Sequence, residues 1–134
     1  MPLLWSTWYE CWSLPPASKA EDLELVKLDP DIKIINLAMV PANFSYTSWS
    51  LNGTGLGFNV SFDELKRAFA MVASKGQTIM FTVGGAGGNY NNTAPYANYQ
   101  GVVQLANDLG AHGIDIDWYS YYKQQAWTWL YFSF

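Results

Sequence analysis

The stretch Gly113–Tyr119 reads Gly-Ile-Asp-Ile-Asp-Trp-Tyr, and its alternation of apolar and polar side chains predicts a β-strand. Alternate residues of a strand point to the same face, so Asp115, Asp117 and Tyr119 share one face and the two isoleucines share the other. Aspartate is disfavoured in strands and costly to bury without a partner. Two aspartates on one face therefore indicate a functional origin.

Three further apolar runs precede this strand, and their continuity is typical of parallel strands that are covered on both faces. These runs are residues 3–8, 33–39 and 78–83. Helical patterns separate the four runs, between residues 18 and 30, 61 and 76, and 102 and 110. Strands that alternate with helices form a parallel sheet through right-handed crossovers. The sequence thus predicts an α/β fold with four parallel strands and three intervening helices.

The helix boundaries carry local signals. Ser18 with Glu21, and Ser61 with Glu64, have the spacing of capping boxes, so the first two helices are expected to begin there. The expected core faces of the helices are Leu23, Val26, Leu28, Phe62, Leu65, Phe69, Val72, Val102, Leu105, Ala106 and Leu109. The residues expected to end the helices are Pro30, Gly76 and Gly110. Residues 41–60, rich in Asn, Ser, Thr and Gly, are expected to form a loop or a short hairpin.

The chain has 134 residues, whereas a closed (β/α)8 barrel needs about 250. We therefore expect residues 1–119 to form a partial barrel of four strands, with bare sheet edges that could support self-association. Residues 120–134 form a divergent tail, whose aromatic segment 127–134 has the composition of an aggregation-prone strand. One hypothesis is that the chain is a truncated version of a longer gene product.

Composition excludes several classes of protein. The net charge of −4, with only seven scattered Lys and Arg residues, argues against nucleic-acid binding. A single cysteine, Cys11, and a single histidine, His112, exclude cysteine-rich and multi-histidine metal sites. The apolar runs are too short to span a membrane, and the N-terminus does not read as an intact signal peptide. Glycosylation triplets begin at four asparagines and favour an extracellular protein: Asn43, Asn52, Asn59 and Asn91.

Ligands of parallel α/β folds bind at the C-terminal ends of the strands, where Asp115 and Asp117 are expected to lie. Two positions along a strand span about 6.5–7 Å, so burial and repulsion should make the two carboxyl groups share a proton. No third carboxylate lies nearby to complete a magnesium site. The glycine-rich run that begins at Gly84 lacks the residues of a phosphate loop, because Tyr90 stands at the last glycine position. The sequence thus predicts no metal and no cofactor.

Aromatic residues make up 17% of the chain, an excess that either a sugar-binding site or a large aromatic core would explain. Trp8, Tyr9 and Trp12 follow the first expected strand and would flank the mouth of the barrel. Packing against a neighbouring loop is an equally good interpretation of each of them.

Two motifs resemble family-18 glycoside hydrolases, which include chitinases and endo-β-N-acetylglucosaminidases. Residues 111–119 are similar to the D-G-x-D-x-D-x-E signature of that family. Residues 81–85 are similar to its S-x-G-G strand, with Thr82 at the serine position. The resemblance covers roughly residues 3–119 and implies the first four strands of a (β/α)8 barrel. It also implies chitin, or other glycans that contain N-acetylglucosamine, as the partner.

The resemblance assigns roles to the acidic residues. Asp117 would hold the substrate N-acetyl group, whose carbonyl oxygen attacks the anomeric carbon, and Asp115 would share its proton with Asp117. The family's general acid corresponds to Tyr119, and the first aspartate of the signature corresponds to His112, to which we assign no chemistry. A phenol titrates near pH 10 and a glutamate at about 4.3, so hydrolysis should be slow.

The expected substrate-binding residues are Trp8, Tyr9, Gly84, Gly85 and Trp118. Three interpretations follow from these assignments. The chain is an inactive part of a chitinase, or a non-catalytic chitin-binding protein of lectin type, or a module that pairs with a second copy to complete a barrel.

Overall fold

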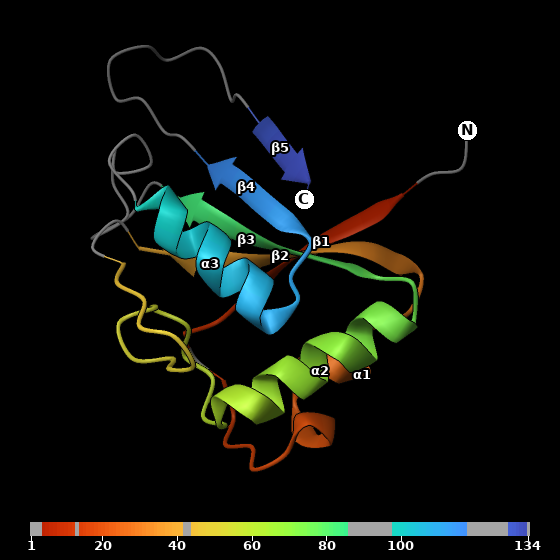
Figure 1. The fold of residues 1–134 in the computed structure, drawn as a ribbon. Helices are drawn as coiled ribbons and strands as arrows, with labels where there is room; N and C mark the ends of the chain where they lie inside the picture. The colour runs from red at the N-terminus through yellow and green to blue at the C-terminus, as the bar shows by residue number, and fades with distance from the viewer. Residues whose placement is uncertain (1–3, 13, 42–43, 86–97, 118–128, 134) are drawn as a thin grey trace.

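The computed structural model describes residues 4–12, 14–41, 44–85, 98–117 and 129–133 (Figure 1). Its elements in chain order are β1 (Trp5–Glu10), a 3-10 turn η1 (Ala20–Asp22), α1 (Glu24–Lys27), β2 (Ile32–Val40), α2 (Phe62–Ser74), β3 (Thr78–Gly84), α3 (Tyr99–Leu109), β4 (Gly113–Asp117) and β5 (Trp129–Ser133). The strands form one sheet in the order β1-β2-β3-β4-β5. β1 to β4 are parallel, which confirms the predicted α/β class.

Helix α2 forms as its sequence predicts. The Ser61 hydroxyl accepts a hydrogen bond from the backbone N–H of Glu64 at 3.2 Å, and four expected core residues of the helix are buried. Gly76 follows the helix with a φ of 74°, a left-handed conformation that glycine adopts without steric cost. The Glu64 carboxylate does not close the capping box. It accepts from the backbone N–H of Ala20 at 2.6 Å and thereby ties α2 to η1.

The first helix differs from its prediction. η1 begins after Lys19, whose side chain makes no capping bond, and the extended backbone of Leu23 separates η1 from the four-residue α1. The capping box expected at Ser18 was therefore wrong. Its physical reason is a tertiary contact, since the Glu21 carboxylate pairs with the guanidinium of Arg67 on α2. Leu23 is buried as expected, because the short segment still packs against α2.

Helix α3 has a cap at each end. The Asn98 side chain accepts from the Gly101 N–H at 3.1 Å, and Gly110 ends the helix with a φ of 82°. Its predicted core face is buried. Helices α1, α2 and α3 lie on one side of the sheet (Figure 1). The core lies between these helices and one face of the sheet, to which Ile35, Leu37 and Phe81 contribute.

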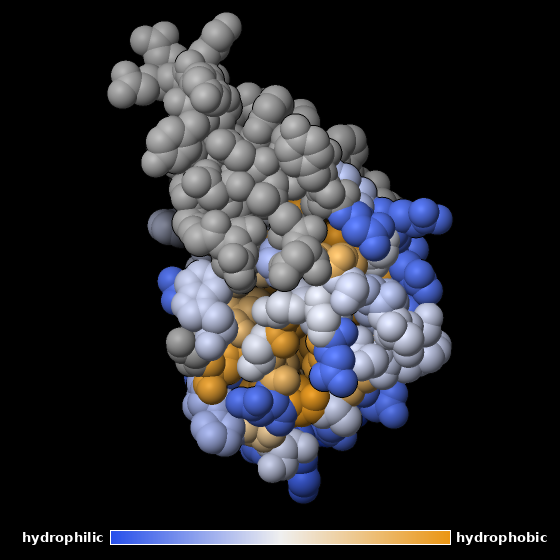
Figure 2. Space-filling view, turned by 90° about the vertical axis from the view of Figure 1, so that its left-hand side faces the viewer, coloured by the Kyte–Doolittle hydropathy of each residue, from blue (hydrophilic) through white to orange (hydrophobic). Residues whose placement is uncertain are grey.

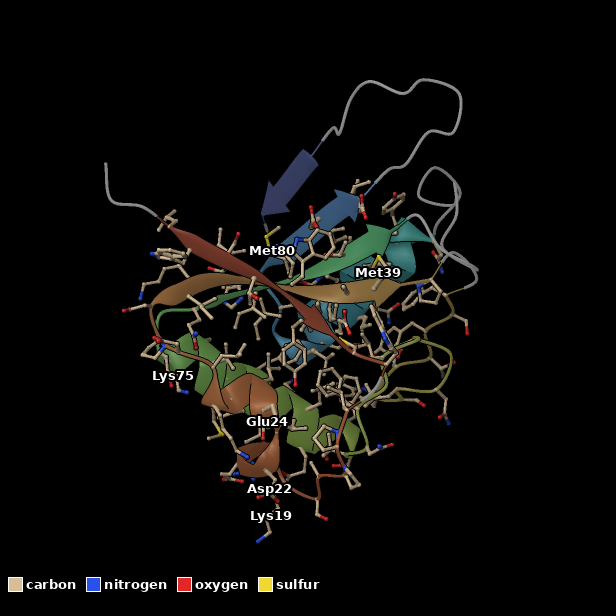
Figure 3. All side chains as sticks on the ribbon, turned by 180° about the vertical axis from the view of Figure 1, so that it is seen from behind. Lys19, Asp22, Glu24, Met39, Lys75 and Met80 are labelled. Atoms are coloured by element: carbon tan, nitrogen blue, oxygen red, sulfur yellow. The ribbon has the colours of Figure 1, made fainter. Side chains whose placement is uncertain are left out.

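The opposite face of the sheet carries the alternate residues of each strand. One row across the sheet joins Glu10, Ala38, Thr82 and Asp115 through the strand register. The preceding row contains Met80, which projects from the side of the sheet away from α2 (Figure 3). The sheet therefore has one apolar, helix-covered face and a second face with polar residues.

The sheet edge at β4 also differs from its prediction. β5 pairs with β4 in antiparallel fashion, from Gly113 opposite Ser133 to Asp117 opposite Trp129. The expectation of two bare edges was therefore wrong at β4, because the backbone of the aromatic tail supplies a strand. Within the described residues β1 pairs only with β2. Trp5 on this edge strand is 67% exposed.

Candidate functional site

The candidate site lies at the C-terminal ends of β3 and β4. The register sets Thr82 opposite Asp115 and Gly84 opposite Asp117. The alternation of strand side chains places Thr82 and both aspartates on the face that the helices do not cover. Sequence analysis predicted this common face for the two acids, and the strand geometry agrees with it.

Asp115 is completely buried. Its Oδ2 accepts a hydrogen bond from the Thr82 hydroxyl at 2.9 Å, whereas Oδ1 has no hydrogen-bond partner in the part of the chain that the structure describes. Burial raises the pKa of Asp115, and the neighbouring charge of Asp117 raises it further, while the bond from Thr82 lowers it in part. A carboxyl group that holds its proton above the usual pH range can donate a hydrogen bond.

Asp117, two residues after Asp115, is the last residue of β4 and is half-buried. Burial raises its pKa as well. For Asp115, burial contributes more to the rise in pKa than the repulsion by Asp117, so desolvation rather than mutual repulsion is the main cause of its shift. The described hydroxyl partner of Asp115 is Thr82. The predicted sharing of a proton between the two acids stays a prediction.

The glycines at the end of β3 bring two backbones together. Gly84 and Gly85 have φ values of 115° and 109°, which side chains with a Cβ rarely adopt. The Gly85 N–H donates to the carbonyl oxygen of Asp117 at 2.9 Å, so β3 and β4 stay joined up to their ends. These glycines position the acidic strand. Their predicted contact with a substrate is untested.

The aromatic residues predicted for the site separate onto the two faces of β1. Trp8 shares a row with Asn36 and Met80 on the polar face and is 42% exposed. Tyr9 points to the helix side, where its ring stacks on Phe58 at 6.3 Å and burial raises its pKa to about 12. The structure therefore assigns Tyr9 to core packing and does not bring it to the acids. The reason is the alternation of β1, which cannot place two consecutive side chains on one face.

The remaining residues singled out in the sequence are Trp12, Trp118, Tyr119 and His112. Trp12 follows β1 and is 51% exposed. Trp118 and Tyr119, which sequence analysis assigned to substrate binding and to the acid position, lie outside the described residues. His112, to which no chemistry was assigned, accepts a hydrogen bond at Nδ1 from the Ile79 N–H at 3.1 Å and stabilises the start of β4.

Sequence analysis missed Asn36. This residue of β2 is buried, and its Oδ1 has no hydrogen-bond partner among the described residues. A buried amide oxygen without a partner costs free energy and is unexpected in a purely structural strand. Asn36 is the only polar residue between Ile34 and Met39, and that interruption of an apolar run was the available signal.

The described residues contain no group of three or more His, Cys, Asp or Glu side chains that could hold a metal ion. Among the same residues, no helix has the length and apolar character needed to cross a bilayer. The groups that the described residues bring together at the site are two carboxyl groups and one hydroxyl.

Comparisons with known proteins bear on the fold. No protein-family model and no curated protein matches the chain. A solved structure named "putative Chitinase A from Streptomyces coelicolor" is similar, with 17% sequence identity and a TM-score of 0.57. The match covers 86% of this chain and 39% of that chain. The fold is therefore chitinase-like, and a partial barrel agrees with both the match and the four parallel strands.

Proposed function

We propose that the chain is a chitinase-like domain of the family-18 type that recognises β-1,4-linked N-acetylglucosamine polymers but lacks the acid needed to hydrolyse them. The observation that carries this proposal is the buried Asp115, held by Thr82 beside Asp117 on the uncovered face of the sheet. The chain spans 39% of its structural neighbour, so substrate and activity belong to this proposal.

The proposed chemistry uses the two acids differently. Asp117, the more accessible acid, accepts a hydrogen bond from the substrate acetamido N–H and orients its carbonyl oxygen toward the anomeric carbon. It also stabilises the positive charge of the oxazolinium-like intermediate, as substrate-assisted glycosidases require. Burial raises the pKa of Asp115, which favours its neutral form and so reduces the repulsion that it exerts on Asp117.

The step that fails is protonation of the leaving oxygen. The residue that resemblance assigns to this task is Tyr119, whose phenol releases its proton near pH 10 and is a much weaker acid than glutamic acid. A positioned general acid contributes typically 10²–10⁴-fold to the rate. We expect hydrolysis at a correspondingly low rate.

A second candidate function is that of a lectin, for which polymer binding itself is the function and hydrolysis has no part. The exposure of Trp8 and Trp12 near the C-terminal end of β1 favours it, because indole rings stack on the apolar faces of sugars.

We also propose that the protein is extracellular. Asn52 and Asn59, each the first residue of a glycosylation triplet, are exposed.

The test measures hydrolysis of a soluble N-acetylglucosamine oligomer and retention on insoluble chitin. We expect the natural chain to bind chitin with background hydrolysis, and Tyr119→Glu to raise hydrolysis by two orders of magnitude or more. The matched control is Tyr119→Gln, which is similar in size to glutamate but cannot donate an acidic proton. Adding Asp117→Asn to Tyr119→Glu should abolish the gain. Absence of both binding and hydrolysis in every variant would refute the proposal.

A further inference from the structure

An exposed tryptophan, Trp49, lies in the loop between β2 and α2, in contact with α2. Residues 47–50 form a turn in which the Ser50 N–H donates to the Thr47 carbonyl oxygen at 3.1 Å. Trp49 is the third residue of this turn and has a φ of 66°. That position normally takes glycine or asparagine, because other side chains are strained at positive φ. Trp49 is the only non-glycine residue with positive φ in the described part of the chain.

The loop holds Trp49 in this conformation through several contacts. Its backbone N–H donates to the Tyr46 hydroxyl at 3.1 Å, and that hydroxyl donates to Asp108 Oδ2 at 2.6 Å. The indole packs at 74° against the ring of Phe62, with 5.5 Å between centroids. Lys66 Nζ lies 5.0 Å from the indole centroid. Residues from α2, α3 and the loop thus fix the orientation of one side chain.

The indole nevertheless stays 58% exposed. A large apolar ring in a strained backbone conformation would usually be buried if packing were its purpose, and strain of this kind is found preferentially at functional sites. The arrangement therefore maintains an oriented aromatic surface in contact with solvent.

The surroundings of the indole indicate the kind of ligand. Besides Phe62, polar groups lie near it: Lys66 Nζ lies over the ring, and Ser48, the preceding residue, accepts a hydrogen bond from Gln104 at 3.0 Å. On the side of the molecule that carries this loop, hydrophilic and hydrophobic residues are intermixed (Figure 2). A protein partner would call for a broader apolar patch around the ring. A pyranose ring, with an apolar face and hydroxyl groups at its edge, matches an aromatic surface bordered by hydrogen-bonding groups.

From this arrangement we infer that Trp49, with Lys66 and the Ser48–Gln104 pair, forms a second carbohydrate-binding site, built from other residues than the acids at the ends of β3 and β4. Its ligand is a β-linked polymer of N-acetylhexosamine, an identification that rests on the proposed function. Such a site would hold the chain on an insoluble polymer independently of the acidic site.

The experiment measures the affinity of the whole chain for insoluble chitin, with cellulose as the second polymer. We expect Trp49→Gly to weaken chitin binding at least fivefold and to leave the chain folded, because glycine accepts the positive φ. Trp49→Ala should weaken binding equally. The matched control is Trp5→Ala, which removes another exposed indole, on β1, and should leave the affinity within a factor of two.

Each outcome decides a different question. If Trp49→Gly binds like the natural chain while Asp117→Asn loses affinity, the second site is refuted and the proposed function stands. If the natural chain binds neither polymer, both are refuted. If Trp49→Gly does not fold, as judged by far-ultraviolet circular dichroism, Trp49 is a packing residue and the inference is overturned. Equal loss on cellulose and chitin would refute the N-acetylhexosamine preference.

Discussion

The two faces of the sheet obey different rules, as two consecutive residues of β3 illustrate. Phe81 points to the helices, is fully buried and packs 6.1 Å from the ring of Phe69. Thr82 points to the other face and is equally buried, and its hydroxyl donates a hydrogen bond to Asp115. Burial on the first face removes apolar area from water and stabilises the fold. Burial on the second face desolvates polar groups, which opposes folding.

This difference separates what the chain needs to fold from what it needs to function. The described core on the helix face is continuous and apolar. Three buried oxygen atoms lack a hydrogen-bond partner within the described residues. Those of Asn36 and Asp115 lie on the other face, whereas the third belongs to Gln77, whose amide N–H groups already tie the start of β3 to the carbonyl oxygens of Asp29 and Ile32. Groups of this kind persist in proteins mainly where a ligand, water or chemistry uses them. The comparison therefore points to the second face as the place of function.

The largest expected effect is the loss of stability in Phe81→Ala, which tests the role of the helix face in folding. This substitution leaves a cavity between the sheet and α2, and we expect the free energy of unfolding to fall by about 3–5 kcal/mol, as for other buried aromatic residues. Urea denaturation followed by circular dichroism measures this change. The control Trp5→Ala, at an exposed aromatic residue, should change stability by less than about 0.5 kcal/mol. Equal losses for the two variants would contradict the assignment of the core to the helix face.

A smaller effect is expected for Thr82→Val, which keeps the volume of the side chain but removes its hydroxyl. Asp115 then loses its described hydrogen bond, and leaving a buried polar group without its partner costs about 1–3 kcal/mol. The Thr82 bond lowers the pKa of Asp115, so its removal should raise that pKa further. Urea denaturation at several pH values measures both effects.

The sign of the pH dependence follows from the direction of the pKa shift. The pKa of Asp115 is raised in the folded state, so the folded chain binds the proton more tightly than the unfolded chain. The contribution of this group to stability is complete below the pKa of the unfolded state and is lost as the pH rises through the folded pKa. Thr82→Val should enlarge that loss, whereas Asp115→Asn should remove it. A loss of the same size in Asp115→Asn would show that other groups cause the pH dependence.

Local signals made part of the fold predictable. Ser61 and Gly76 bound α2 because their contacts lie within one turn of the helix. The signal at Ser18 failed since Glu21 pairs with Arg67, 46 residues away in the chain. The pairing of β5 with β4 was missed for the same reason: a strand edge can bind any extended segment, and composition does not specify which one.

The site was predictable to a similar degree. The alternation rule found the common face of Asp115 and Asp117 because it depends only on neighbouring residues. The same rule, applied to β1, separates Trp8 from Tyr9, so the assignment of both to one site was inconsistent with it. Asn36 was missed because its burial depends on the register of three strands, which the sequence does not reveal.

The smallest expected effect concerns Trp49. This residue is an exception to the rule of the helix side, because it is aromatic and yet remains exposed. Trp49→Gly and Trp49→Ala both lose the contact with Phe62, but only glycine accepts the φ of 66° without strain. We expect the glycine variant to be more stable than the alanine variant by about 1 kcal/mol, opposite to the usual order within a helix. Thermal and urea denaturation of the two variants measure this difference. An alanine variant that equals or exceeds the glycine variant would show that the turn relaxes when the indole is removed, so that the indole itself, through Phe62 and Lys66, imposes the strained backbone.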